Sequence, residues 1–150
     1  MKLSLTMLIL VSFVYCISAA EIFQDITYTV QGRVTFTKDI PITVTCLTKE
    51  EFEEELPAQY FYVHSPTKAD LKKEYIDFII SDIPEGDFIL FAFQDKNEND
   101  KLDKIIMVPK EYWHIYGLER PTTGKPDFQN LAIHINKNFS NLDMNLRKGF

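Results

Sequence analysis

The chain has 150 residues, with 16 basic and 22 acidic side chains and a formal net charge of −6 at pH 7. Proteins bind nucleic acids and anionic membrane surfaces largely by neutralising phosphate charge, so this acidic balance argues against both as partners. The length suits one domain of ordinary size.

The first 20 residues have the layout of a cleavable secretion signal. Lys2 supplies a positive charge, an apolar run covers 8–17, and small residues occupy 18–20 at the expected cleavage position. The apolar run is too short for a membrane span, and no later stretch of the sequence is long and apolar enough to be one. We therefore expect export to the periplasm or the cell exterior, with residues 21–150 as the mature domain.

Alternating apolar and polar residues predict strands in the next segment. Apolar residues recur at every second position from Ile26 to Phe36, and Gly32 within this series is expected to mark a bulge or bend. A second strand is expected at 40–46. Cys46 is the single cysteine of the mature chain, so an internal disulfide is excluded, and its phase in the second strand predicts a small buried hydrophobe.

The period changes at Thr48. Thr48 and Glu51 have the spacing of a capping box, which predicts a short helix near 49–56 that stops before Pro57. The helix is rich in glutamate, and we interpret these side chains as a solvated face near the positive end of the helix dipole rather than as a metal cluster.

The remaining elements are short strands, expected at 60–63, 75–80, 88–93, 131–136 and 142–147. The 88–93 run is apolar at every position, which predicts a central strand covered on both faces. We expect a hairpin around 137–139 between the last two strands. About seven strands and one short helix predict a single antiparallel β-sandwich of transthyretin-like or immunoglobulin-like type.

The acidic loop 95–103 carries the most specific chemical signal. Oxygen ligands for calcium occur at alternate positions of the loop, four from side chains and one from a backbone carbonyl, which are Asp95, Asn97, Asn99, Lys101 and Asp103. Calcium takes six to eight oxygen ligands, and a tightly curled loop turns alternate positions inward. The sequence therefore predicts calcium as a cofactor, with Glu111 as a further ligand and Glu85 or Asp87 as the next candidates.

This loop departs from the EF-hand pattern. Its sixth position is Asp100 instead of glycine, and its twelfth is Ile106 instead of glutamate. The alternative interpretation is a polar turn, in which Asp and Asn side chains cap their own backbone.

Four blocks of sequence together resemble a bacterial family, called domain of unknown function 2141, of small exported proteins. The blocks lie at 82–88, 93–103, 109–111 and 126–132. The resemblance implies a transthyretin-like or prealbumin-like β-sandwich and implies no catalytic residue. This chain has Asp100 where the family usually has glycine, and 112–116 replaces a glycine-containing stretch.

The aromatic residues Tyr112, Trp113 and Tyr116 form a second candidate site. Exposed aromatics can stack on sugars or contact a protein partner, and the alternative is an ordinary lid over the core. The three histidines match no zinc-binding spacing.

We predict a non-enzymatic exported protein that binds a protein or carbohydrate at the cell envelope. Two alternatives stay open at this point. One is a structural envelope component that needs no metal, and the other is a hydrolase with a cleft near Glu111 and His114.

Overall fold

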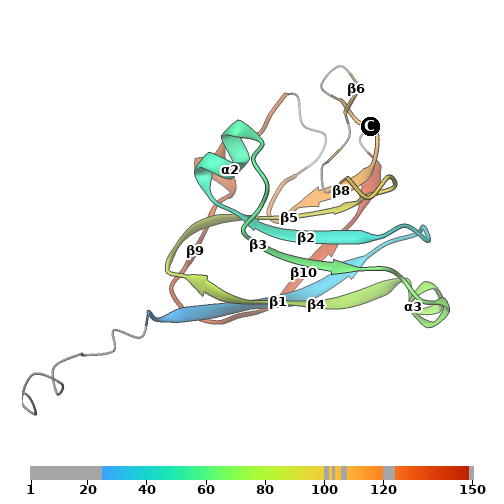
Figure 1. Ribbon diagram of the computed structural model, residues 1–150, viewed down its shortest axis with the longest axis horizontal. Helices are drawn as coiled ribbons and strands as arrows, with labels where there is room; N and C mark the ends of the chain where they lie inside the picture. Colours follow the sequence, from blue (N-terminus) through green and yellow to red (C-terminus); the bar gives the residue numbers. More distant parts are fainter. Residues whose placement is uncertain (1–24, 100–101, 103, 106–107, 120–123, 149–150) are drawn as a thin grey trace, which may run out of the picture.

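Two β-sheets packed face to face form the protein in the computed structural model, which describes residues 25–99, 102, 104–105, 108–119 and 124–148 (Figure 1). The protein is mainly β, as the sequence predicts, and the described residues contain three short helices where the sequence predicts one. The expected secretion signal at 1–20 lies outside the described residues.

Sheet A contains three strands, β1 (Thr27–Thr35), β4 (Tyr75–Pro84) and β10 (Phe139–Asn145), in the order β10-β1-β4. β1 pairs antiparallel with β4 but parallel with β10. The sequence predicts an antiparallel sandwich, and the β1–β10 pair is an exception to it. β4 continues to Pro84 and the next strand, β5, begins at Gly86, so Glu85 alone separates them.

Sheet B has the order β11-β8-β5-β2-β3, and β9 pairs with the first residues of β5. Its strands are β2 (Ile42–Leu47), β3 (Tyr60–His64), β5 (Gly86–Gln94), β8 (Tyr112–Ile115), β9 (Ile133–Ile135) and β11 (Arg147–Lys148). A separate small pair is formed by β6 (Lys104–Ile105) and β7 (Val108–Pro109). The expected hairpin around 137–139 is wrong, because β9 pairs with β5 while β10 joins the other sheet beside β1.

The helices are α2 (Lys49–Glu54), α3 (Lys68–Lys73) and α4 (Phe128–Leu131). The capping box predicted for α2 is confirmed. The Thr48 hydroxyl accepts from the Glu51 N–H at 3.3 Å, and the Glu51 carboxylate accepts from the Thr48 N–H at 2.7 Å. Helix α3 has the same device, formed by Thr67 and Asp70.

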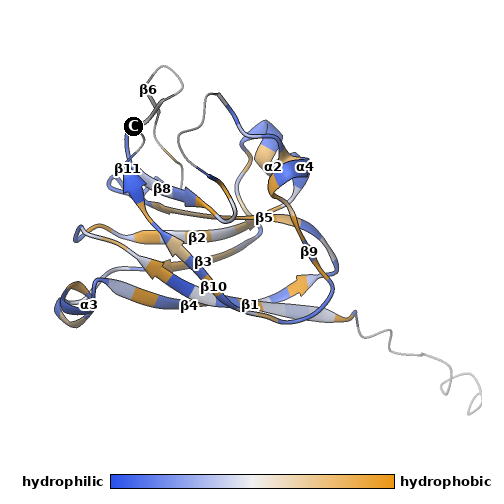
Figure 2. Ribbon diagram, turned by 180° about the vertical axis from the view of Figure 1, so that it is seen from behind, coloured by the Kyte–Doolittle hydropathy of each residue, from blue (hydrophilic) through white to orange (hydrophobic). Residues whose placement is uncertain are grey.

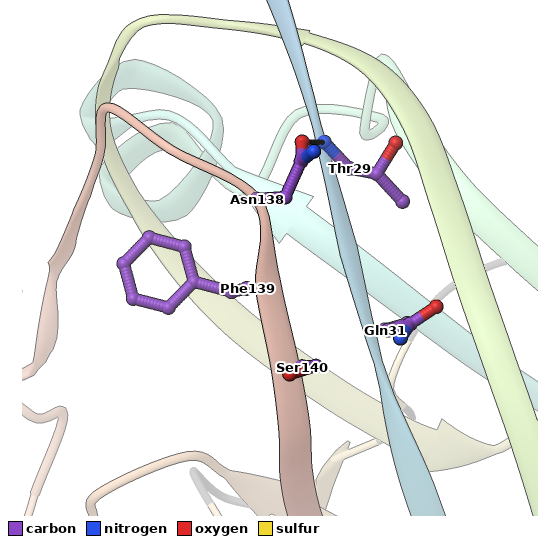
Figure 3. Close-up of a pocket in the computed structure, with 5 residues that line it drawn as sticks. All are labelled: Thr29, Gln31, Asn138, Phe139 and Ser140. Atoms are coloured by element: carbon purple, nitrogen blue, oxygen red, sulfur yellow. Dashed lines mark hydrogen bonds between the residues drawn. The ribbon is translucent and has the colours of Figure 1, made fainter.

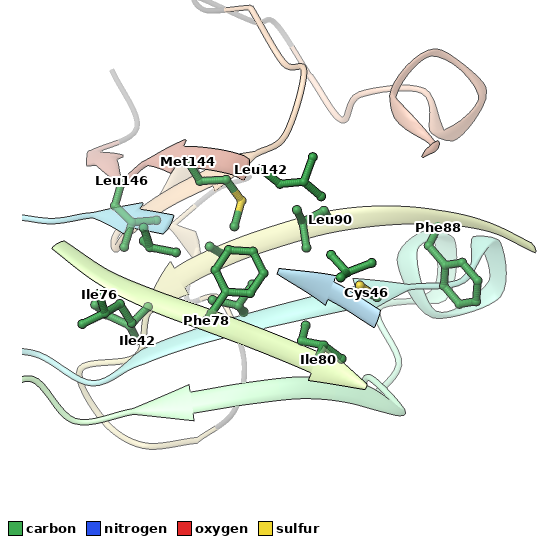
Figure 4. Close-up of a cluster of buried hydrophobic side chains, with 14 of the residues drawn as sticks. Ile42, Cys46, Ile76, Phe78, Ile80, Phe88, Leu90, Leu142, Met144 and Leu146 are labelled. Carbon is green, nitrogen blue, oxygen red and sulfur yellow. The ribbon is translucent and has the colours of Figure 1, made fainter. Parts of the chain in front are cut away.

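The main core lies between the two sheets, where inward residues of both meet (Figure 4). Alternation along the strands produces it, and Figure 2 shows this alternation as successive hydrophobic and hydrophilic segments on β10. Leu142 and Met144 point inward, and Asp143 between them is exposed. Cys46 is fully buried in this core, which confirms its interpretation as a small hydrophobe.

A second hydrophobic cluster covers the other face of sheet B. Ile89 and Phe93 of β5 meet Trp113 and Ile115 of β8 there, with Phe128 of α4 packed on top. The prediction that β5 is covered on both faces is therefore confirmed. Partly buried apolar side chains complete this layer, among them Phe52 of α2, Leu118 and Leu131.

Candidate functional site

The acidic loop begins where β5 ends. Asp95 follows the last residue of β5, and Glu111 precedes the first residue of β8. Phe93 pairs with Trp113 across these strands, and extending that register places Asp95 opposite Glu111. Both carboxylates are buried, with 2% of Asp95 and 7% of Glu111 exposed.

Backbone N–H groups of the loop donate to both carboxylates. The Lys96 N–H donates to Glu111 Oε1 at 2.9 Å, and the Asn99 N–H donates to Asp95 Oδ1 at 3.2 Å. Glu98 adopts the left-handed conformation, with φ of 55°, which lets the chain curl back. Residues 96–99 therefore curve over two buried carboxylates, one at the end of β5 and one at the start of β8.

The energetics of this arrangement depend on how its negative charge is balanced. Carboxylates opposite each other on neighbouring strands repel. Burial raises the free-energy cost of keeping both charged, unless hydrogen-bond donors, protons or cations offset that charge. The two loop N–H groups supply part of that compensation. Oxygen ligands alone, at this position, suit a hard cation better than a transition metal.

The other predicted ligands in this loop are only partly described by the structure. Asn97 and Asn99 lie exposed on the same loop, and Lys101 and Asp103 lie outside the described residues. Within the part of the chain that the structure describes, no cluster of three or more His, Cys, Asp or Glu side chains is arranged to hold a metal ion.

Glu85 and Asp87 do not reach this loop. They lie around the opposite end of β5, and Asp95 comes eight positions after Asp87 along the extended chain, roughly 26 Å away. Asp87 instead contacts His134 of β9, with 2.8 Å between carboxylate and ring Nδ1, and Glu85 lies 3.9 Å from the ring Nε2. Their proposed role as reserve metal ligands for 95–103 is therefore wrong.

The aromatic residues Tyr112, Trp113 and Tyr116 do not form one surface. Alternation along β8 sends Trp113 into the second cluster, where 6% of it is exposed. Tyr112 and Tyr116 are half-buried and pack against the core between the sheets. The structure places all three rings in packing positions, and only the two tyrosines retain exposed edges.

Glu111 and His114, the two residues named for a possible hydrolase cleft, lie on opposite faces of β8. Glu111 shares the face of β8 that carries Trp113 and Ile115, whereas the intervening His114 alternates onto the other face. His64 is on β3, which β5 and β2 separate from β8 in the sheet order. The described geometry therefore brings neither His64 nor Glu111 to His114.

Sequence reasoning missed a polar group at β3 and α3. His64 Nε2 lies 3.0 Å from Asp70 Oδ2, and the Tyr62 hydroxyl lies 3.5 Å from His64 Nδ1. The Thr67 hydroxyl and backbone N–H, followed by His64, hold the pKa of Asp70 well below its usual range. Burial raises the pKa of Tyr62, which disfavours the phenolate.

The signal for this group was present in the sequence. Thr67 and Asp70 have the capping spacing that identified α2, and His64 comes three residues earlier. The arrangement fastens α3 to the edge strand β3, and we assign it no chemistry.

No helix in the described ranges is long and apolar enough to cross a membrane.

Comparisons with known proteins identify one family. Comparison with curated proteins and with solved structures found no match. Residues 39–142, more than half of the chain, match the family described as uncharacterized protein conserved in bacteria, domain of unknown function 2141, and the chain belongs to that family.

Proposed function

We propose that this protein is an exported, non-enzymatic β-sandwich that binds a protein or carbohydrate at the cell envelope, and that calcium orders its 95–103 loop. The observation that carries the calcium part is the pair of buried carboxylates, Asp95 and Glu111, beneath that loop. A cation between them would offset two buried negative charges, and the loop offers further oxygens.

The position of the loop suggests what calcium would do. The segment after β5 leads through 95–111 into β8, and both strands contribute to the second hydrophobic cluster. A cation held by Asp95 and Glu111 would tie the two strand ends together where their ladder stops. We expect a modest affinity, with a dissociation constant on the order of 0.1–1 mM, as in other extracellular calcium modules.

A thermal-unfolding comparison tests the calcium proposal. The protein is melted in excess EDTA and in millimolar calcium or magnesium. Ligand at about 100 times its dissociation constant adds roughly 2.7 kcal/mol, which corresponds to a rise of several degrees at this size. We expect the rise with calcium and a smaller one with magnesium.

Matched variants identify the ligands. Asp95→Asn and Glu111→Gln keep side-chain shape but remove charge, and each should abolish most of the calcium-induced rise. Glu98→Gln removes an exposed carboxylate of the same loop outside the predicted ligand series, and should keep it. The same calcium response in all three variants, or no response in the parent protein, would contradict the proposal.

A second candidate, a structural envelope component independent of metal, is favoured by the loop hydrogen bonds. Asp95 and Glu111 already accept backbone N–H groups of Asn99 and Lys96, as in a polar turn. An absent calcium response, together with destabilisation by Asp95→Ala but not by Glu98→Ala, would support this candidate.

A further inference from the structure

β3 forms an open edge of sheet B. It is the last strand in the sheet order and pairs with β2 along its whole length, from Tyr60 to His64, while no strand in the described ranges pairs with its other side. Figure 1 shows β3 with no helix or strand drawn over it, with α2 toward one end of the strand and α3 at the other. An open edge presents backbone N–H and C=O groups that can pair with a further strand.

The edge of sheet A at β10 carries features that oppose such pairing. β10 has one residue more than β1 between Phe139 and Leu142, and Asn141 in this bulge has φ of 61°. Figure 3 shows the Asn138 side chain directed toward β1, where its Oδ1 accepts the Thr29 N–H at 2.9 Å. A bulge bends the strand and interrupts the regular ladder that a further strand would need.

The other terminal strands of the two sheets are also protected. β4 has one residue more than β1 between Ile80 and Ile83, where Asp82 has φ of 61°. β11 is two residues long, and both residues, Arg147 and Lys148, are charged. β3 contains no Asp, Glu, Lys, Arg, Pro or Gly, and its register with β2 is unbroken. It therefore lacks the devices by which edge strands avoid one another.

The outward face of β3 is apolar. Tyr60 and Tyr62 pack against the core between the sheets, so alternation directs Phe61 and Val63 to the other side. Phe61 is 58% exposed and Val63 is 49% exposed. Pairing with a further strand would cover part of both side chains as well as the open backbone groups.

The two ends of β3 carry opposite charge. Before the strand, the five glutamates within 50–55 outnumber the two cations beside α2, Lys49 and Lys125. After the strand, residues 68–74 contain three lysines and two carboxylates, and one of these carboxylates, Asp70, already pairs with His64. An antiparallel copy of the same segment would therefore bring a basic end to the side of the acidic end.

We propose that β3 pairs antiparallel with β3 of a second copy of this chain, about a two-fold axis at Tyr62. This register places Phe61 of each copy opposite Val63 of the other and joins the two copies of sheet B into one sheet. An aromatic side chain opposite a β-branched one is a favourable cross-strand pair. The inference goes beyond the proposed function and does not depend on the 95–103 loop.

Charge favours a second copy over a uniformly acidic or basic partner. A copy in antiparallel order presents lysines to the acidic end and glutamates to the basic end, whereas a partner of one charge would be repelled at one of the two ends. The uncharged strand also lets two chains of net charge −6 meet without like charges across the new ladder.

Sedimentation equilibrium of the mature protein in EDTA tests the association. Five residues from each strand bury less than the roughly 1,200 Å² of a standard interface, so we expect a weak dimer with a dissociation constant on the order of 0.1 mM. Phe61→Lys and Val63→Lys should each weaken it at least about tenfold, because lysine on an edge strand opposes pairing. Ile26→Lys adds the same charge at an exposed position before β1 and should leave the association unchanged.

A spin label tests the orientation of the pair. With the two-fold axis at Tyr62, Gln59 of one copy lies opposite Ser65 of the other. A nitroxide on Gln59→Cys should therefore broaden the Ser65 amide of a second, isotope-labelled copy, and the reduced label is the control. Cys46 is buried and should not take up the label.

Three results would overturn the inference. They are a protein that stays monomeric up to about 1 mM, equal association by the Phe61 and Ile26 variants, or broadening centred on Gln59 itself or on another strand. The lysine variants should keep the unfolding midpoint of the parent protein in dilute solution, which separates lost pairing from lost folding. Because every measurement is made in EDTA, dimerisation is decided independently of the calcium proposal, and either can fail without the other.

Discussion

At the scale of single residues, Gly32 sets the spacing between two strands of sheet A. A Cβ atom added there would lie 2.1 Å from the Leu142 carbonyl oxygen, a backbone atom with little freedom to move. The sequence marked this glycine as a bulge or bend, and the bulge lies beside it on β10. The absent side chain therefore permits the parallel pairing of β1 with β10.

Replacement of Gly32 by alanine should destabilise the protein by about 2 kcal/mol or more, because β1 and β10 must separate to admit the methyl group. Urea unfolding followed by circular dichroism measures this. Gly86→Ala is the matched control, since its added methyl group would meet only the edge of the Phe88 ring at 3.2 Å. Equal effects of the two substitutions would refute the close-approach explanation.

Cys46 is buried among apolar side chains, and that burial raises the pKa of its thiol to about 12. The thiolate is the reactive form, so iodoacetamide at pH 8 should leave Cys46 unmodified in the native protein and alkylate it in denaturant. Mass spectrometry of both samples checks this. Rapid alkylation of the native protein would mean that the core between the sheets opens readily.

At the scale of elements, two short helices depend on the same side-chain device at their start. Thr48 with Glu51 begins α2, and Thr67 with Asp70 begins α3. Each helix ends at a residue in the left-handed conformation, Glu55 with φ of 57° and Glu74 with φ of 63°. Helices this short are unstable alone, so their caps and their contacts with the strands hold them.

Stability should fall as pH falls below about 4, because Asp70 must take up a proton that its folded environment disfavours. The pKa of Asp70 is lowered from 3.8, so its stabilising contribution is present above that pH and is lost on acidification. Thermal melts from pH 6 to pH 3 test this. Asp70→Asn should lose this part of the acid sensitivity.

The Thr67 hydroxyl has the largest part in lowering the pKa of Asp70. Thr67→Ala should therefore flatten the fall in stability with acid, whereas Thr67→Ser keeps the hydroxyl and should resemble the parent protein. Identical acid profiles for both Thr67 variants would show that other carboxylates control acid unfolding.

At the scale of the whole molecule, sheet B is covered on both faces at β5 and β8, whereas sheet A is covered on one face. This asymmetry divides the protein into a core between the sheets, a second cluster beyond sheet B, and an open polar face beyond sheet A. Phe128 of α4 fixes the second cluster, packing against Phe52 of α2 with ring centres 6.2 Å apart.

Phe128→Ala should cost about 3 kcal/mol, because it empties a buried site between α4, α2 and sheet B. Chemical denaturation measures the loss. Gln129→Ala, the exposed neighbour on the same helix, should change stability by less than about 0.5 kcal/mol. A small effect of Phe128→Ala would mean that this layer contributes little to folding.

Several features follow from local sequence alone. Alternation identifies most strands and the inward residues of each, the capping box identifies α2, and the continuous apolar run identifies β5 as covered on both faces. These features depend on side chains within a few residues of one another, so the sequence contains them directly. The transthyretin-like arrangement, export and calcium binding stay predictions.

Other features were decided by pairing between distant segments. The parallel β1–β10 pair, the placement of β9 on β5 and the opposition of Asp95 to Glu111 all depend on which strands become neighbours. Alternation has the same form in a parallel and an antiparallel strand, so the sequence could predict which residues point inward but not their partners. Contacts with distant segments also decided the positions of Tyr112, Trp113 and Tyr116, for which the sequence suggested an exposed aromatic surface. The tertiary structure packs these rings on opposite sides of sheet B. It leaves the polar face of sheet A open.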